Sequence, residues 1–323
     1  YLLMGALMCL ATLFAALVDE VTSILFMMST MFHLVKRYKL NPAPFLLMLV
    51  FTTNIGSSAT AVGNPIGVMI AMRAHLTFAD FLRWASPISV VALGATIPMC
   101  FFLFRSSMKD LDEKMKRERK ELDETKHIPH KASDIRLCWA LFGLTVFFLV
   151  THAFVEKLLG LEKNSMLLGT SLAAAAVVIL LMAGEARDFF MRRVDWWTLS
   201  FFMSLFASVG TLKYVGVTER IAGFMLSVGL ENQTALLVIF TAAISLLTGF
   251  MDNVLAVATF IPILKELAEA GVYAFPFWWG MLFGGTLYGN LTTIGSTANI
   301  VALGMMEKEA QIFKCEKPEF DGV

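Results

Sequence analysis

The chain has 323 residues, 57% of them hydrophobic, and its mean hydropathy is +0.70. Its 26 basic and 26 acidic residues cancel, so the overall charge gives no indication of a nucleic-acid partner. The apolar residues come in long runs rather than in an amphipathic rhythm, which predicts an all-α polytopic membrane protein.

Residues 1 to 18 and 21 to 35 are apolar and are separated by Asp19 and Glu20. One continuous helix is the alternative here, but it would exceed a hydrocarbon core of about 30 Å and leave both acids at its middle. We therefore expect the two short arms of a re-entrant hairpin, with the acids at its tip.

The next helix is predicted to begin at Asn41-Pro42-Ala43-Pro44, because Pro is favoured in a first helical turn. Small, hydroxyl and amide residues interrupt its apolar run over residues 54 to 65. Backbone can leave the helical form at membrane depth only where it lines a cavity or is buried in protein. We therefore predict a broken helix that faces the protein interior, followed by a plain span over residues 84 to 104.

Acidic and basic residues alternate closely over residues 105 to 134. Neighbouring opposite charges support a solvated helix, so this segment is expected to be a linker between two halves. Residues 135 to 230 are expected to be scaffold helices, with spans near 135–155, 165–184 and 196–215 and an amphipathic segment from Val217 to Leu230.

Residues 231 to 306 repeat the pattern of residues 1 to 104. Asp252 interrupts an apolar run, a Pro-Phe helix follows, and small polar residues break that helix. At one constant offset Phe51, Thr60 and Gly63 pair with Phe283, Thr292 and Gly295. Interrupted apolar segments at corresponding positions of two halves indicate a transporter's binding site.

The basic residues predict the orientation. Lys36, Arg37, Lys39 and the linker share one side, which the positive-inside rule makes cytoplasmic. The first hairpin then enters from the cytoplasm and the second from outside, as inverted repeats require. The comparison of the two halves also predicts three helices before Tyr1 and another span after Met306, with residues 307 to 323 as a polar tail.

The hairpin tips are candidates for ion coupling. An acid in the hydrocarbon region costs about 2.5 to 3.5 kcal/mol on insertion scales, and it persists where it faces an aqueous cavity or an ion path. A buried carboxyl group can bind a proton or a sodium ion in turn. The alternative is that these acids only cap helices. The candidates are Asp19, Glu20, Asp252 and Asn253.

The two breaks combine free backbone carbonyl and N–H groups with neutral side-chain oxygens and amides, which suits the binding of ions. Packing by small residues is the alternative. The candidate binding residues are Asn54, Gly56, Ser57, Ser58, Thr60, Gly63, Asn64, Asn290, Thr292, Thr293, Gly295, Ser296, Thr297 and Asn299. There is no phosphate loop, catalytic triad or metal-ligand spacing, so we expect no enzyme, no ATP, no cofactor and no metal beyond Na⁺ at these loops.

The motifs at both tips and both breaks resemble one known group of proteins. Residues 18–23 (Val-Asp-Glu-Val-Thr-Ser) and 251–254 (Met-Asp-Asn-Val) resemble the hairpin tips of the ion transporter superfamily, and residues 54–65 and 289–302 resemble its paired loops. The nearest branch holds arsenite permeases, D-type sodium/proton antiporters, the P protein and silicon exporters. The resemblance implies a homodimeric carrier whose mobile transport domain moves against a scaffold by an elevator-type motion.

Two residues depart from the pattern of this superfamily. Glu20 stands where Asn is usual in the first tip, and Asn64 precedes Pro where Asp is common. Both departures bear on the ion specificity of the first site.

We expect a secondary transporter in a prokaryotic inner membrane that moves a small inorganic solute, such as arsenite, silicic acid or an anion, with H⁺ or Na⁺ as coupling ion. Its partners are the lipid bilayer, the solute and a second copy, with no nucleic acid. The breaks contain no Lys or Arg, which disfavours a multiply charged carboxylate such as citrate. Two alternatives stay open: an antiporter with Na⁺ as its cargo, and a passive anion channel.

Overall fold

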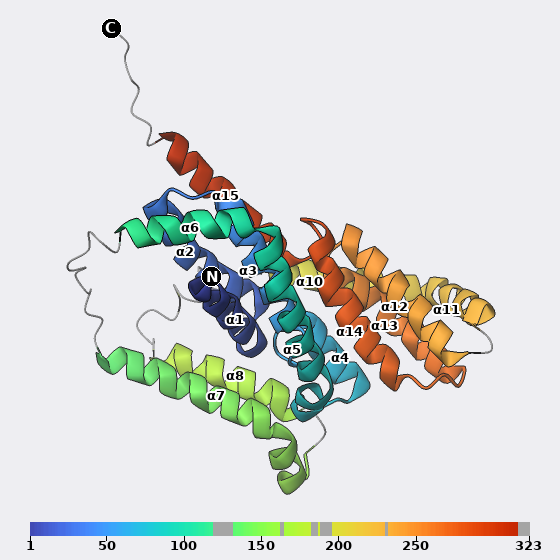
Figure 1. The fold of residues 1–323 in the computed structure, drawn as a ribbon. Coiled ribbons are helices and arrows are strands. Elements are labelled where there is room, and N and C mark those ends of the chain that lie inside the picture. The colour runs from blue at the N-terminus through green and yellow to red at the C-terminus, as the bar shows by residue number, and fades with distance from the viewer. Residues whose placement is uncertain (119–131, 162–164, 182–186, 188–195, 230–231, 316–323) are drawn as a thin grey trace.

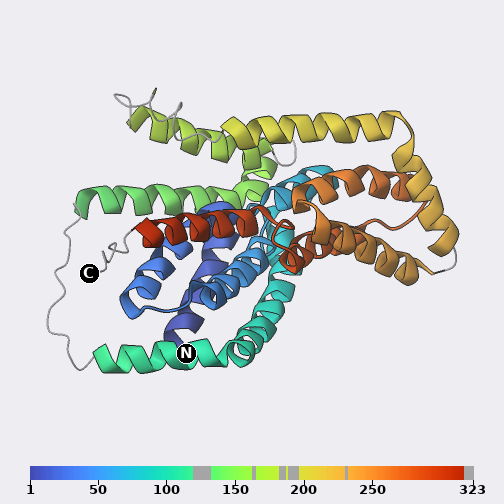
Figure 2. The same ribbon diagram turned by 90° about the horizontal axis from the view of Figure 1, so that it is seen from above.

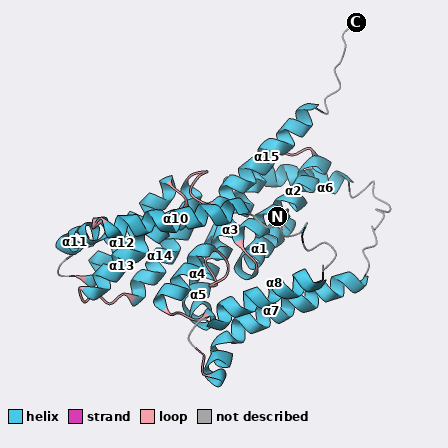
Figure 3. Ribbon diagram, turned by 180° about the vertical axis from the view of Figure 1, so that it is seen from behind, coloured by secondary structure: helices cyan, strands magenta, loops and turns pink. Residues whose placement is uncertain are grey.

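The computed structural model describes residues 1–118, 132–161, 165–181, 187, 196–229 and 232–315. Within these ranges every regular element is a helix (Figure 3). The predicted all-α class is therefore confirmed.

The first half contains six helices in the described ranges. They are α1 (Leu2–Leu17), α2 (Glu20–Tyr38), α3 (Pro42–Ser57), α4 (Pro65–Ala74), α5 (Phe78–Leu103) and α6 (Arg105–Glu118). The predicted linker thus begins as a helix, and the rest of it lies outside the described residues.

The second half begins with helices that correspond to the predicted spans. They are α7 (Ala132–Leu159), α8 (Ser165–Leu181), α10 (Trp196–Tyr214) and α11 (Val217–Gly229). The interrupted segments follow as α12 (Gln233–Phe250), α13 (Asn253–Glu269), α14 (Phe275–Leu287), a short 3₁₀ helix η1 (Tyr288–Leu291) and α15 (Thr297–Cys315).

One predicted boundary is wrong, one predicted segment is partly helical, and local chemistry explains both. Helix α5 begins at Phe78 rather than near residue 84, because Thr77 and Asp80 form a reciprocal capping box with Thr77 as N-cap. Helix α15 continues to Cys315, past Met306, because the polar residues that follow are good helix formers. Part of the predicted tail is therefore helical.

Polar caps start the helices around both breaks. Asp19 caps α2, and Asp252 caps α13. Asn41 and Asn64 cap α3 and α4, and in each case Pro occupies the first helical turn. Such a cap satisfies backbone N–H groups that a helix end leaves unpaired, so these residues fix where each segment resumes.

The acidic pair of the first half separates two helices that pack against each other. Helix α1 ends at Leu17, and α2 begins at Glu20. Ser23 Oγ on α2 donates a hydrogen bond to the carbonyl oxygen of Ala11 on α1 (3.1 Å). The chain therefore turns back at Asp19 rather than continuing as one long helix.

The core consists of two large clusters, and each contains a helix from the other half of the chain. Helix α15 packs against α2 and α3, with Ala298 and Ala302 buried among residues of the first hairpin. Helix α4 packs against α13 and α14, with Ile66 and Ile70 buried among residues of the second half. Figure 1 shows α15 beside α2, and Figure 2 shows the same ribbon from above.

Two described helices, Phe78–Leu103 and Gln233–Phe250, are long and apolar enough to cross a membrane by length and composition. Large apolar side chains on α5, among them Val91 and Phe102, are 73% exposed. Exposed side chains of this kind on a long apolar helix are suited to contact with lipid.

Candidate functional site

The first hairpin places two adjacent acids in different environments. Asp19 Oδ2 accepts hydrogen bonds from the backbone N–H groups of Val21 (3.0 Å) and Thr22 (3.3 Å). Glu20 is only 1% exposed, and its Oε2 accepts a hydrogen bond from Ser57 Oγ (3.0 Å). The capping interpretation of Asp19 is therefore correct, and it leaves room for an ion-coupling role because both cap hydrogen bonds use one oxygen.

Ser57 and Asn64 connect the Glu20 carboxylate to the first loop. Asn64 Nδ2 donates to Ser57 Oγ (3.0 Å), while Asn64 Oδ1 accepts the backbone N–H of Gly67 (2.8 Å). The backbone N–H of Glu20 donates to the carbonyl oxygen of Gly63 (3.0 Å). The hairpin tip and the loop thus form one buried polar cluster.

The second hairpin tip repeats the cap but not the whole cluster. Asp252 Oδ1 accepts hydrogen bonds from the backbone N–H groups of Val254 (2.9 Å) and Leu255 (3.3 Å). Its Oδ2 accepts a hydrogen bond from Thr297 Oγ1 (3.1 Å). Asn253 is fully buried, and its side-chain amide lies beside the Glu20 carboxylate without a hydrogen bond of 3.5 Å or less to any described residue. The Asn253 amide faces the Glu20 carboxylate, and the Asp252 carboxylate lies nearby, so the two tips approach each other.

Asn54 joins the two loops directly. Its Nδ2 donates to Asn290 Oδ1 (2.6 Å) and to Asn299 Oδ1 (3.0 Å), and its Oδ1 accepts Ser296 Oγ (3.0 Å). Asn299 Nδ2 in turn donates to the carbonyl oxygens of Gly289 and Thr292 (2.8 Å each). Two segments more than 230 residues apart therefore share one buried amide network.

Paired hydroxyl residues hold each loop to its own hairpin. Thr60 Oγ1 donates to the carbonyl oxygen of Ala16, at the end of α1. Thr292 Oγ1 donates to the carbonyl oxygen of Gly249, at the end of α12 (2.6 Å). Ser58 Oγ also binds a backbone carbonyl, that of Ile55 (2.7 Å). The role of these hydroxyls is thus to position the loops.

The glycines of the loops allow close backbone approach. A Cβ at Gly63 would overlap the carbonyl oxygen of Ser57, and a Cβ at Gly295 would lie 2.6 Å from that of Gly289. A Cβ at Gly56 would overlap the backbone of Thr12 on α1. Any larger residue at these positions would force the backbone apart.

A cavity of about 430 Å³ opens beside Asp19. It lies between the first tip, the first loop, α4 and the start of α13, and its polar side chains are Asp19 and Asn64. No Lys or Arg lines it. An acid in such a cavity suits a small cation.

The sequence of residues 1–284 matches a known family, CitMHS, described as citrate transporters. The chain belongs to this family.

Several relatives of this CitMHS protein carry transporter names. A protein of Mycobacterium tuberculosis named as an uncharacterized transporter is 32% identical over 312 residues, which cover 95% of this chain and 69% of the relative. A second such transporter, from Synechocystis, is 25% identical over 330 residues, which cover 96% and 71%. The P protein of Homo sapiens is 25% identical over 388 residues, which cover 95% and 45%.

These findings confirm the predicted superfamily and the broad class of activity. The CitMHS protein is an integral membrane protein and a transporter rather than an enzyme.

Most of the predicted site residues lie in the connected clusters described above, but Thr293 does not. It is exposed and lies outside the Asn54 network.

The sequence analysis missed support from α5. Ser89 Oγ lies 3.1 Å from Ser58 Oγ, and Ser86 Oγ donates to the carbonyl oxygen of Ala59 (2.8 Å). Their spacing of three residues, on one face of an apolar helix, was the available signal. Thr53 and Thr286 were missed as well. Both are fully buried, and neither hydroxyl has a hydrogen-bond partner within the described ranges.

Proposed function

We propose that this CitMHS protein is a secondary active transporter of the elevator type that moves a small inorganic solute, coupled to H⁺ or Na⁺. The observation that carries the proposal is the Asn54 network, which joins both interrupted segments between two acid-capped hairpins. A site built at the meeting of two such halves is the arrangement that secondary transporters use.

The proposal includes inverted repeats with two re-entrant hairpins and two broken helices. Three correspondences support it: Asp19 with Asp252 as helix caps, Thr60 with Thr292 as anchors, and Gly63 with Gly295 as points of close approach. The repeats would span residues 1–104 and 135–306, joined by the linker 105–134, with residues 135–230 as scaffold.

The chemistry of the site favours a solute that is neutral or carries one charge. The tips and loops offer hydroxyl groups, amides and carboxylates, and they contain no Lys or Arg. Arsenite and silicic acid are uncharged near neutral pH and rich in hydroxyl groups, so amide and hydroxyl side chains can bind them without a cationic partner. Glu20, Asp19 and Asp252 are then available for the coupling ion.

Two observations favour other cargoes. The acidic cavity at Asp19 would also suit Na⁺ as the transported ion of an antiporter. The family description names citrate, whose carboxylates would need bound cations or helix N-termini in this site.

We further propose that the protein works as a homodimer in a prokaryotic inner membrane, with the linker on the cytoplasmic side. The basic cluster at the end of α2 and the linker support this orientation through the positive-inside rule.

The test is thermal stabilisation of the purified protein by Na⁺, Li⁺, arsenite, silicic acid, phosphate and citrate, because a ligand that binds only the folded state raises the melting temperature. Flux is then measured in proteoliposomes with the ligand that stabilises. We expect arsenite or silicic acid to stabilise in the presence of Na⁺ or at low pH, and to move uphill when an ion gradient is imposed.

Three outcomes would contradict parts of the proposal. Stabilisation by citrate alone, unchanged in Asp252→Asn, would reject both the solute and the role of the acids. Stabilisation by Na⁺ with no effect of any solute would favour the antiporter. Flux that only follows the electrochemical gradient would indicate a channel.

A further inference from the structure

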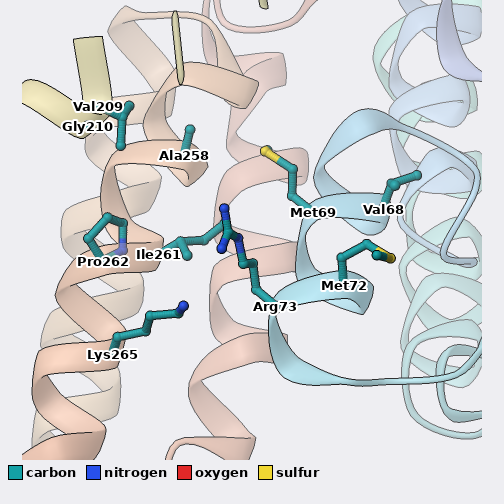
Figure 4. Close-up of a pocket in the computed structure, with 10 residues that line it drawn as sticks. All are labelled: Val68, Met69, Met72, Arg73, Val209, Gly210, Ala258, Ile261, Pro262 and Lys265. Carbon is teal, nitrogen blue, oxygen red and sulfur yellow. The ribbon is translucent and has the colours of Figure 1, made fainter. Parts of the chain in front are cut away.

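A second cavity runs along α4 and α13 toward the ends of these helices that lie opposite the capped loops, and it shares Val68 and Met69 with the cavity beside Asp19. It has a volume of about 400 Å³, and its walls come from α4, α10 and α13 (Figure 4). Eight of its ten lining residues are apolar or glycine, and the other two are Arg73 and Lys265. The proposed transport site uses neither of these basic residues.

The two cations line the cavity from different helices. Figure 4 shows the side chain of Arg73 extending from α4 toward Ile261 on α13, with Lys265 on α13 below it and with Met69 and Ala258 above. Neither cation forms an ion pair with a described residue, even though Glu269 follows Lys265 by four positions on the same helix. The charges are therefore available to an external anion.

Both cations also lie close to the ends of their helices. Arg73 is in the last turn of α4, which ends at Ala74, and Lys265 is four residues before the end of α13 at Glu269. The residues just beyond, His75 and Ala270, are exposed. The span α5 starts at Phe78, directly after α4. The ends of α4 and α13, where Arg73 and Lys265 lie, therefore correspond to the boundary between lipid chains and headgroups.

We propose that this cavity binds an anionic phospholipid. The phosphate would lie between Arg73 and Lys265, where the planar guanidinium can bind two of its oxygens. An acyl chain would follow the apolar wall past Ile261 and Met69. A small hydrophilic anion fits less well, because most of the wall offers it no hydrogen-bond donor. Basic side chains at a membrane boundary attract anionic headgroups. In the orientation proposed above, α5 runs from this boundary to the cytoplasmic linker, so the lipid would lie in the outer leaflet.

The bound lipid would contact α4 of the first half and α10 and α13 of the second half together. Helix α4 belongs to the first interrupted segment, α13 to the second, and Gly210 to α10. The proposal does not depend on the identity of the transported solute.

The experiment uses the purified protein in detergent, with dioleoyl phosphatidylglycerol as the probe. Retained lipid is counted by native mass spectrometry, and the melting temperature is measured. We expect the lipid to raise the melting temperature by about 2 °C or more. Phosphatidylcholine with the same chains, and glycerol 3-phosphate without chains, should have little effect.

Two variants test the site in different ways. Arg73→Gln with Lys265→Gln removes the charges, and Gly210→Leu narrows the cavity. A Cβ at Gly210 would meet no atom within 4 Å, so this substitution is expected to fold. Both should lose most of the stabilisation by phosphatidylglycerol. The matched control, Arg83→Gln with Lys109→Gln, removes two charges outside the cavity and should keep the stabilisation by phosphatidylglycerol. Arg83 lies over the Trp84 ring instead.

Three results would overturn the proposal. Equal stabilisation by glycerol 3-phosphate would make this a site for small anions. Equal stabilisation by phosphatidylcholine would show that the headgroup charge is irrelevant. Phosphatidylglycerol stabilisation that survives in Gly210→Leu would place the lipid elsewhere.

Discussion

The two interrupted segments have the same plan but differ in how completely their polar groups are paired. In the first, residues 52 to 61 are all buried, and Glu20 at the tip is hydrogen-bonded to Ser57. In the second, Leu291, Thr293 and Ile294 are exposed, and Asn253, which occupies the tip position of Glu20, has no hydrogen-bond partner in the described chain. The polar groups of the first half are therefore more fully paired and buried than those of the second half.

The difference matters because an unpaired buried amide is costly. A buried amide without a full set of hydrogen bonds costs about 1 to 3 kcal/mol, and at the second tip the nearest polar partner of Asn253 is the Glu20 carboxylate of the first tip. The variants below test whether the two halves differ in this way in their contributions to stability and to ion-coupled transport.

The largest effect is expected from adding a side chain to the loop glycines, where two backbone segments lie in close contact. Gly63→Val should cost more than about 3 kcal/mol and abolish recovery of folded protein, because the surrounding residues are buried and cannot move away. Gly295→Val should destabilise the protein less, since its loop has exposed neighbours. The yield of folded protein and the melting temperature report the loss of stability in both variants. Gly94→Val is the control, because a Cβ there meets no atom within 4 Å. Equal damage at Gly63 and Gly94 would contradict the close-packed loop.

The next effect concerns the amide that joins the halves. Asn54→Ala leaves Asn290, Asn299 and Ser296 without this partner and should cost about 2 to 4 kcal/mol. A double-mutant cycle with Asn290→Ala, followed by denaturant or thermal unfolding, should give a coupling energy above about 0.5 kcal/mol. Additive losses would mean that the loops do not support each other. Asn232→Ala, at an exposed cap, serves as the comparison and should cost about 1 kcal/mol.

The tip residues should respond in opposite directions. Asn253→Leu replaces an unpaired amide by an apolar side chain of similar size, so stability should stay within about 1 kcal/mol or rise, while ion-coupled flux is lost. Glu20→Leu removes the partner of Ser57 and should destabilise by about 1 to 3 kcal/mol. If Asn253→Leu destabilised as much as Glu20→Leu and kept full flux, the amide would be structural.

The smallest effect on stability is expected at the two caps. Asn caps a helix about as well as Asp, so Asp19→Asn and Asp252→Asn should change the free energy of unfolding by less than about 0.5 kcal/mol. Stabilisation by Na⁺ or by protons should nevertheless disappear, which a titration of melting temperature against Na⁺ and pH can detect. Asp112→Asn on α6, whose carboxylate pairs with Lys116 outside the membrane helices, should leave that titration unchanged. A normal ion response in both cap variants would assign the coupling to Glu20 alone.

The sequence by itself determined the local features of this protein. Apolar runs predicted the helices, and Asp, Asn and Pro predicted where each one resumes, because capping depends on residues only a few positions apart. The doubled order of acid, Pro-Phe helix and small polar break predicted both the transporter class and most of the residues around Asn54. The same local pattern gave α5 the wrong start, since the Thr77–Asp80 capping box was overlooked.

Tertiary structure alone decided which residues of that doubled pattern meet. The sequence aligns Asn54 with Thr286, yet Asn54 binds Asn290, Asn299 and Ser296 across the interface, and α4 and α15 each pack into the other half. Periodicity records only which face of a helix is apolar, whereas the partner of that face depends on how all the helices pack at once. For the same reason the sequence could not distinguish the paired Glu20 from the unpaired Asn253.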